Sequence, residues 1–204
     1  MSTSVSGAAA TRPDPARARR RGRLIALALF AACAVPVVAG YLAYFYFPPS
    51  GRVNYGELVD TRPLPGGGLA RPGGAPFGIE SLRGKWVLLH VDRAECPSPC
   101  AAKLFNMRQV RLAQGKDMDR VERLWVLLDE SMPGPELARL TEGVVLARSL
   151  DGALVRALPA PSEASDHVYL VDPLGNLVLR FPKDADPKRM IKDLQRLLKY
   201  SGIG

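Results

Sequence analysis

Two cysteines, Cys96 and Cys100, are the residues of this sequence best suited to chemistry. Only Pro97-Ser98-Pro99 separates them, and the preceding run Trp86-Val87-Leu88-Leu89 is apolar on both faces, as in a central strand covered by helices. The segment that follows, 101–113, has apolar residues at the spacing of an amphipathic helix. The pair is therefore predicted to lie where a buried strand passes into the N-terminus of a helix.

A cysteine pair at a helix N-terminus is suited to redox chemistry or metal binding. Unpaired backbone N–H groups and the positive end of the helix dipole stabilise a thiolate there and lower the pKa of the thiol. Two thiolates on adjacent turns can form a disulfide, bind a soft metal ion, or do both in succession. The alternative is a permanent structural disulfide, although a crosslink that closes so short a loop removes little loop entropy.

Four other side chains bear on this chemistry. His167 begins a later strand and is either a third metal ligand or a structural histidine. Asp92 and Glu95 precede the first cysteine and are either proton acceptors for a thiol or ordinary exposed carboxylates. His90 alternates within the buried strand, and we interpret it as a core histidine because the middle of a strand lies far from the helix start.

The remaining elements predict an α/β domain with a central mixed sheet and flanking helices. Residues 123–129 indicate a second buried strand, which forms a right-handed parallel strand–helix–strand unit with the first. Residues 167–172 and 177–181 flank a turn and predict a hairpin. Asp186 and Pro187 then predict the start of the last helix, as its N-cap and first helical residue.

The N-terminal part predicts a membrane anchor. Residues 1–23 are rich in small residues and arginine and predict a disordered tail. Residues 24–47 carry no charge and, at ~1.5 Å per residue, are long enough to span a hydrocarbon core of ~30 Å as a transmembrane helix. The competing interpretation is a cleaved signal peptide, whose apolar region is usually only about 7–15 residues long.

The distribution of charge sets the expected orientation. More than half of the net charge of +8 lies in residues 1–23, and only Arg52 follows the apolar segment closely. The positive-inside rule therefore predicts a single-pass protein of the inner (plasma) membrane, with a cytoplasmic N-terminus and an extracytoplasmic (periplasmic) C-terminal domain. Because the rest of the chain is nearly balanced in charge, we expect no nucleic-acid partner.

The composition changes again after the apolar segment. Residues 48–76 are rich in proline and glycine and predict a tether and lead-in, followed by the folded domain at 77–204. Cys33 lies inside the apolar segment, where we interpret it as a small packing residue.

The order of elements resembles the thioredoxin fold, with the cysteine pair at the start of the first helix of the domain. The motif Cys-Pro-Ser-Pro-Cys at 96–100 resembles the Cys-Pro-x-x-Cys motif of the Sco/SenC family, membrane-anchored copper proteins that assist cytochrome c oxidase assembly. Three further segments are similar to that family: Asn-Tyr-Gly-Glu-Leu at 54–58, Gly-Lys-Trp-Val-Leu-Leu-His-Val at 84–91 and Tyr-Leu-Val-Asp-Pro-Leu-Gly-Asn at 169–176.

The resemblance implies copper as the cofactor, bound by Cys96, Cys100 and a histidine. Sco proteins carry that histidine a few residues before the tyrosine of the later strand, where this chain has Ala164; His167 is therefore the expected third ligand. The implied function is a metallochaperone-type accessory factor for respiratory oxidase assembly, which handles copper or reduces thiols. Its implied partners are an oxidase subunit or another thiol protein.

Two other functions stay open at this point. The first is a metal-free, membrane-tethered thiol–disulfide oxidoreductase, in which Cys96 is the attacking thiolate and Cys100 the resolving one. The second is a non-catalytic assembly scaffold with a structural disulfide.

Overall fold

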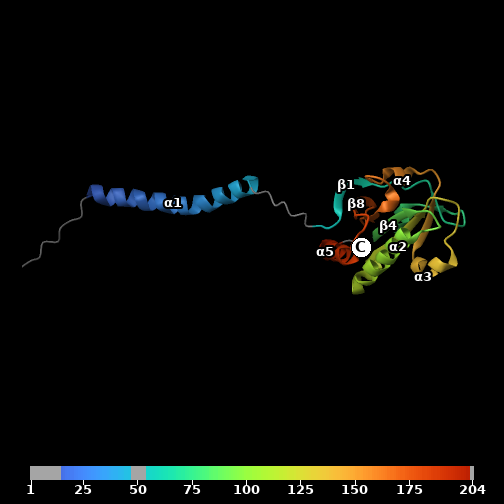
Figure 1. Cartoon of the computed structure of the whole chain (residues 1–204). Coiled ribbons are helices and arrows are strands. Elements are labelled where there is room, and N and C mark those ends of the chain that lie inside the picture. The colour runs from blue at the N-terminus through green and yellow to red at the C-terminus, as the bar shows by residue number, and fades with distance from the viewer. Residues whose placement is uncertain (1–14, 47–53, 203–204) are drawn as a thin grey trace, which may run out of the picture. The chain divides into compact units, whose positions relative to one another are not determined.

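The computed structural model describes residues 15–46 and 54–202 (Figure 1). By its contacts the chain divides into two units, Met1–Arg52 and Val53–Gly204.

The described part of the first unit, residues 15–46, forms the helix α1 (Pro15–Tyr46). Its segment Gly22–Ala43 is long and apolar enough to cross a membrane, in agreement with the helix predicted at 24–47. Residues 15–23 are helical, whereas the sequence predicted disorder up to residue 23. Arginine and alanine are good helix formers, so the helix continues outward from the apolar segment. The rest of the predicted disordered tail lies outside the described residues.

The second unit combines a mixed sheet with helices and short 3₁₀ turns. In chain order its elements are β1 (Glu57–Pro63), β2 (Leu69–Ala70), β3 (Pro76–Phe77), η1 (Ile79–Leu82), β4 (Trp86–Asp92), α2 (Ser98–Leu112), η2 (Gly115–Arg120), β5 (Val121–Leu127), η3 (Pro135–Leu137), α3 (Ala138–Thr141), β6 (Val145–Ser149), α4 (Ala153–Ala157), η4 (Ala164–Asp166), β7 (Val168–Val171), β8 (Asn176–Arg180) and α5 (Pro187–Tyr200).

One sheet of eight strands runs through the unit in the order β1-β8-β7-β4-β5-β6-β2-β3. β4 pairs in parallel with β5, and β5 in parallel with β6, which confirms the predicted strand–helix–strand unit. β4 pairs antiparallel with β7, and β7 with β8, which confirms the predicted hairpin. The predicted α/β class, with a mixed sheet and flanking helices, is therefore confirmed.

The two faces of the sheet are packed against different helices. α2 and α5 lie side by side over one face (Figure 1) and bury Leu104, Met107 and Leu194 against it. η1 and α4 contribute Ile79 and Leu154 to the core on the opposite face. Each face therefore has its own apolar cluster, and the central strands are buried on both sides, as their apolar sequences indicated.

β4 distributes its residues between these two clusters by alternation. Trp86 and Leu88 belong to the cluster under α2 and α5, while Val87 and Leu89 belong to the other. Because successive side chains of a strand point to opposite faces, His90 has the same orientation as Trp86 and Leu88. This places it on the α2 face of the sheet.

The folded part of the chain includes residues of the segment 48–76, which the sequence predicted to be a tether and lead-in. Within 48–76, β1 pairs antiparallel with β8 at the edge of the sheet. Glu57 of β1 also accepts a hydrogen bond from the Arg180 guanidinium of β8. Proline and glycine around β1 obscure its strand pattern in the sequence, whereas the exposed edge of β8 supplies the backbone partners that make it a strand.

A buried carboxylate holds the start of β1 against α5. Asp193 is only 3% exposed, and its Oδ2 accepts a hydrogen bond from the Gly56 backbone N–H at 2.8 Å. The backbone of Gly56 also lies close to Phe181, since a Cβ on Gly56 would be 3.1 Å from the Phe181 ring. This hydrogen bond joins two residues that are 137 positions apart, and it fixes the lead-in segment to the last helix of the domain.

We expect Asp193→Ala to lower the free energy of unfolding of the second unit by about 1–3 kcal/mol, because the Gly56 N–H loses its buried acceptor. Urea titration followed by fluorescence of the buried Trp86 and Trp125 measures this change. Asp193→Asn keeps an acceptor oxygen and is the matched control, with a smaller loss expected. Equal losses in the two variants would show that the hydrogen bond is not the cause.

Candidate redox and metal site

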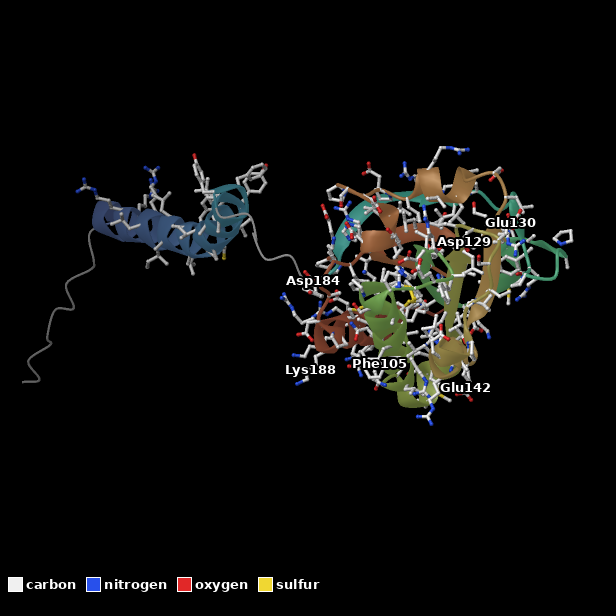
Figure 2. The ribbon with its side chains drawn as sticks, turned by 45° about the vertical axis from the view of Figure 1, so that its right-hand side comes forward. Phe105, Asp129, Glu130, Glu142, Asp184 and Lys188 are labelled. Carbon is white, nitrogen blue, oxygen red and sulfur yellow. A yellow bond between two sulfur atoms is a disulfide. The ribbon has the colours of Figure 1, made fainter. Side chains whose placement is uncertain are left out.

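Cys96 and Cys100 are joined by a disulfide, with 5.1 Å between their Cα atoms. The bond lies at the N-terminal end of α2, where it appears in yellow near the upper end of the green helix (Figure 2). Cys96 is 5% exposed and Cys100 is fully buried. The pair therefore lies at the transition from strand to helix that the sequence indicated.

The two prolines shape the loop between the cysteines. Pro97 is the N-cap of α2 and Pro99 lies in its first turn, where the fixed φ of proline suits a helix start. Neither proline has an N–H, and the Cys100 N–H already donates to Pro97 O at 2.8 Å. Among the first three residues of α2, only Ser98 therefore has an N–H that is neither missing nor bonded to Pro97 O. Few backbone N–H groups can then donate a hydrogen bond to a cysteine thiolate at this helix start.

The backbone at Cys96 has a left-handed conformation. Its φ is 43°, a region that costs a residue with a side chain roughly 1–2 kcal/mol relative to ordinary helical values. The turn is held by the Cys96 N–H, which donates to Arg93 O at 3.2 Å. The chain thus turns sharply between β4 and the start of α2 at Ser98.

The end of β5 supports the segment between β4 and the cysteines. The Leu128 N–H donates to Asp92 O at 3.1 Å, which continues the β4–β5 pairing by one residue. The carboxylate of Asp129, labelled in Figure 2, accepts the Ala94 N–H at 3.3 Å. Two backbone groups in the approach to the cysteines are therefore fixed by the neighbouring strand.

Three potential metal ligands meet beside the disulfide. A ring nitrogen of His90, a carboxylate oxygen of Asp92 and the sulfur of Cys100 all lie within 4.8 Å of one another. His90 is fully buried, as a core histidine would be, but the expectation that it lies far from the helix start is wrong. It is the third residue from the end of β4, and this end of the strand abuts the first turn of α2.

The sequence contains a signal for this cluster in the alternation of β4. Trp86, Leu88, His90 and Asp92 occupy alternate positions of one strand, and the first two were interpreted as core residues. If the strand packs against the following helix, period-two alternation directs His90 and Asp92 toward that helix as well. Glu95, the other acidic candidate, is exposed and is not part of the cluster.

The two ring nitrogens of His90 differ in whether they have a hydrogen-bond partner. Nδ1 lies 3.0 Å from the backbone oxygen of His167. Nε2 is buried and has no hydrogen-bond partner among the residues that the structure describes, and it lies 3.6 Å from Oδ2 of Asp92. That separation is too long for a hydrogen bond.

Opposing influences act on the carboxyl group of Asp92. Burial raises its pKa, whereas the neighbouring His90 and the Arg93 N–H, which donates to Oδ1 at 2.8 Å, lower it. Lys103, on the second turn of α2, lowers it further through its positive charge. The net effect is a pKa below the usual value for aspartate, which keeps the group ionised beside the cysteines.

His167 lies close to the site but outside this cluster. Its side chain is buried, and Nδ1 lies 2.8 Å from the backbone oxygen of Phe181 at the end of β8. Its own backbone oxygen contacts His90. The neighbouring Asp166 forms an ion pair with Lys183 at 2.7 Å; hydrogen bonds from Lys183 and Ser162 lower the pKa of Asp166 to about 2.

These features define the class of protein to which the chain belongs. The chain has a mixed sheet whose central strand passes into a helix that begins with two disulfide-bonded cysteines, which is a thioredoxin-like arrangement. The family model described as "Transmembrane-like, thioredoxin-like, C-terminal domain" matches residues 86–201. The chain belongs to this family. A comparison with curated protein sequences finds no match.

Several solved structures share the fold. Apo Sco1 from Thermus thermophilus has a TM-score of 0.54 and 23% sequence identity, over 72% of this chain and 99% of that one. Copper-bound yeast Sco1 has a TM-score of 0.53 and 16% identity, over 72% and 90% of the two chains. Copper-bound ScoI from Arabidopsis thaliana has a TM-score of 0.53 and 15% identity, over 72% and 99%. The predicted distant resemblance to Sco proteins is confirmed in the fold.

After reduction of the disulfide, we expect iodoacetamide to alkylate Cys96 faster than Cys100. Cys96 retains some exposure and precedes the helix, whereas Cys100 is fully buried in its first turn. Mass spectrometry of the peptides that contain each cysteine, sampled over time, measures the two rates. Equal and slow labelling of both cysteines would instead favour a structural disulfide.

Proposed function

We propose that this chain is a membrane-anchored accessory factor for respiratory (cytochrome c) oxidase assembly that handles copper through Cys96 and Cys100. The observation that carries the proposal is the cysteine pair at the start of α2, which lies beside a buried imidazole. Its support from the comparisons is a fold shared with Sco proteins, two of which were solved with copper bound.

The residues present fit a copper ion by their chemistry. Thiolate and imidazole are ligands that copper accepts, and the sulfur atoms, held together by the disulfide, are already adjacent. Before binding, the disulfide must be reduced: a partner dithiol gives two electrons and two protons, the S–S bond breaks to leave two thiols, and the partner becomes a disulfide. Copper bound there is cargo for transfer to a partner protein.

We expect the reduced full-length chain to bind one Cu(I) ion, and Cys96→Ser or Cys100→Ser to abolish this binding, because each removes one of two soft ligands. Competition with a chromophoric Cu(I) chelator measures the affinity. Cys33→Ser is the matched control, since Cys33 is unpaired in the described structure and lies in α1; this variant should bind copper like the parent.

A metal-free thiol–disulfide oxidoreductase is the second candidate, favoured by the disulfide itself. In that function a partner thiolate attacks one sulfur, and a second partner thiol resolves the mixed disulfide, so that the electrons pass to Cys96 and Cys100. A parent protein that binds no Cu(I) but exchanges disulfides with a model dithiol would select this function over the first.

The same proposal places the domain in the periplasm. α1 supplies a segment of suitable length for an anchor, and the arginine excess precedes it, so we propose a cytoplasmic N-terminus in the inner (plasma) membrane. The partner is then an oxidase subunit or another thiol protein on the outer side of that membrane.

We expect a reporter enzyme fused after Gly204 to be active if it requires an extracytoplasmic location, and a cytoplasmic reporter at the same point to be inactive. Reporter activity in intact cells measures this. The reverse pattern would contradict the proposed topology and remove the oxidising compartment on which the redox chemistry depends.

A further inference from the structure

We propose that the side chains of His90 and Asp92, rather than that of His167, complete the copper site with Cys96 and Cys100. This inference rests on the proposed copper-handling function and names the nitrogen and oxygen ligands of the same site. It contrasts with the sequence-based expectation of His167, and it follows from three observations about the β4 side of the cysteine pair.

The first observation is position. His90 and Asp92 occupy alternate residues at the end of β4, so both side chains point to the face of the sheet that α2 covers. A nitrogen, an oxygen and the Cys100 sulfur meet within 4.8 Å of one another. Shifts of an ångström or two would bring these atoms to ordinary metal–ligand distances of roughly 2.0–2.3 Å around one ion.

The second observation is the tautomer of His90. A carbonyl oxygen only accepts hydrogen bonds, so the 3.0 Å contact with the His167 backbone oxygen requires that Nδ1 of His90 carries the proton. In the neutral ring, Nε2 then has a free lone pair. This atom is buried without a hydrogen-bond partner in the described part of the chain, a costly state that a metal ion would relieve.

This hydrogen bond has the form that metal-binding histidines usually show. The nitrogen that does not bind the metal donates to a backbone carbonyl or a carboxylate, which fixes the ring and its tautomer. The backbone of His167 performs that role for His90. His167 thus contributes to the site through its carbonyl group, while its own ring lies outside the cluster of three.

The third observation concerns charge. Two thiolates and the Asp92 carboxylate carry three negative charges around a partly buried point, which favours a divalent over a monovalent ion. The site therefore binds Cu(II) with the help of His90 and Asp92, whereas Cu(I) depends mainly on the two sulfur atoms.

The test uses two matched variants, His90→Asn and His167→Asn, in the untagged, detergent-solubilised full chain. The asparagine side-chain N–H takes the place of the ring Nδ1–H, so each variant keeps a donor toward its carbonyl partner and loses the part of the ring that carries Nε2. The chain contains two histidines, so any imidazole signal comes from one of these two residues. Circular dichroism confirms that each variant is folded.

Cu(II) is added without oxygen to the reduced proteins, and pulsed EPR detects nitrogen from imidazole. We expect the parent and His167→Asn to show the imidazole signal and His90→Asn to lose it. The Cu(II) affinity of His90→Asn should fall on the order of 100-fold, the upper end of the loss that follows removal of a group supporting a metal ligand. Cu(I) affinity should change far less. Asp92→Asn should lower Cu(II) affinity roughly tenfold and provides the test if His90→Asn does not fold.

The outcomes separate this inference from the proposed function. Cysteine-dependent copper binding whose imidazole signal persists in His90→Asn and disappears in His167→Asn overturns the inference and leaves the function standing. A parent that binds copper with no imidazole signal, or that reduces Cu(II) without forming a stable cupric site, also overturns it. A parent that binds no copper through Cys96 and Cys100 overturns the proposed function itself, and the inference with it.

Discussion

The pairing of β4 with β5 on one side and β7 on the other is the constraint on which the site depends. These two ladders fix the register of β4 and thereby which of its residues face α2. A slip by one residue would turn His90 and Asp92 toward the opposite cluster and away from Cys100. The same pairing brings the start of β7 beside β4, so that the carbonyl of His167 reaches the ring of His90.

Local sequence patterns were sufficient to predict most of the fold. The apolar runs of β4 and β5, the amphipathic spacing of α2 and the Asp186-Pro187 start of α5 each have a local physical cause, and the structure contains all of them. Asp186 accepts the Lys188 N–H, as an N-cap should. β1 was not predicted because its strand conformation depends on β8, a partner far away in the sequence.

The candidate site was predicted only where its residues are close in sequence. The position of Cys96 and Cys100 at a helix start follows from adjacent elements, whereas the neighbours of Cys100 depend on how far along β4 the helix packs. His167 was predicted as a ligand by resemblance to a known motif, because it is the histidine nearest Ala164, the position at which that motif has its histidine. The spatial relation between His90 and Cys100 depends on strand alternation combined with tertiary packing, and neither is apparent from the spacing of the cysteines.

The Pro-Ser-Pro loop has a consequence for recognition by other proteins. Pro97, Ser98 and Pro99 are exposed, while the sulfur atoms behind them are almost inaccessible to solvent. A protein that exchanges electrons or metal with the cysteines must therefore dock on this short rim. Because both prolines already have a fixed φ, a protein that docked there would restrict little further backbone freedom in the loop.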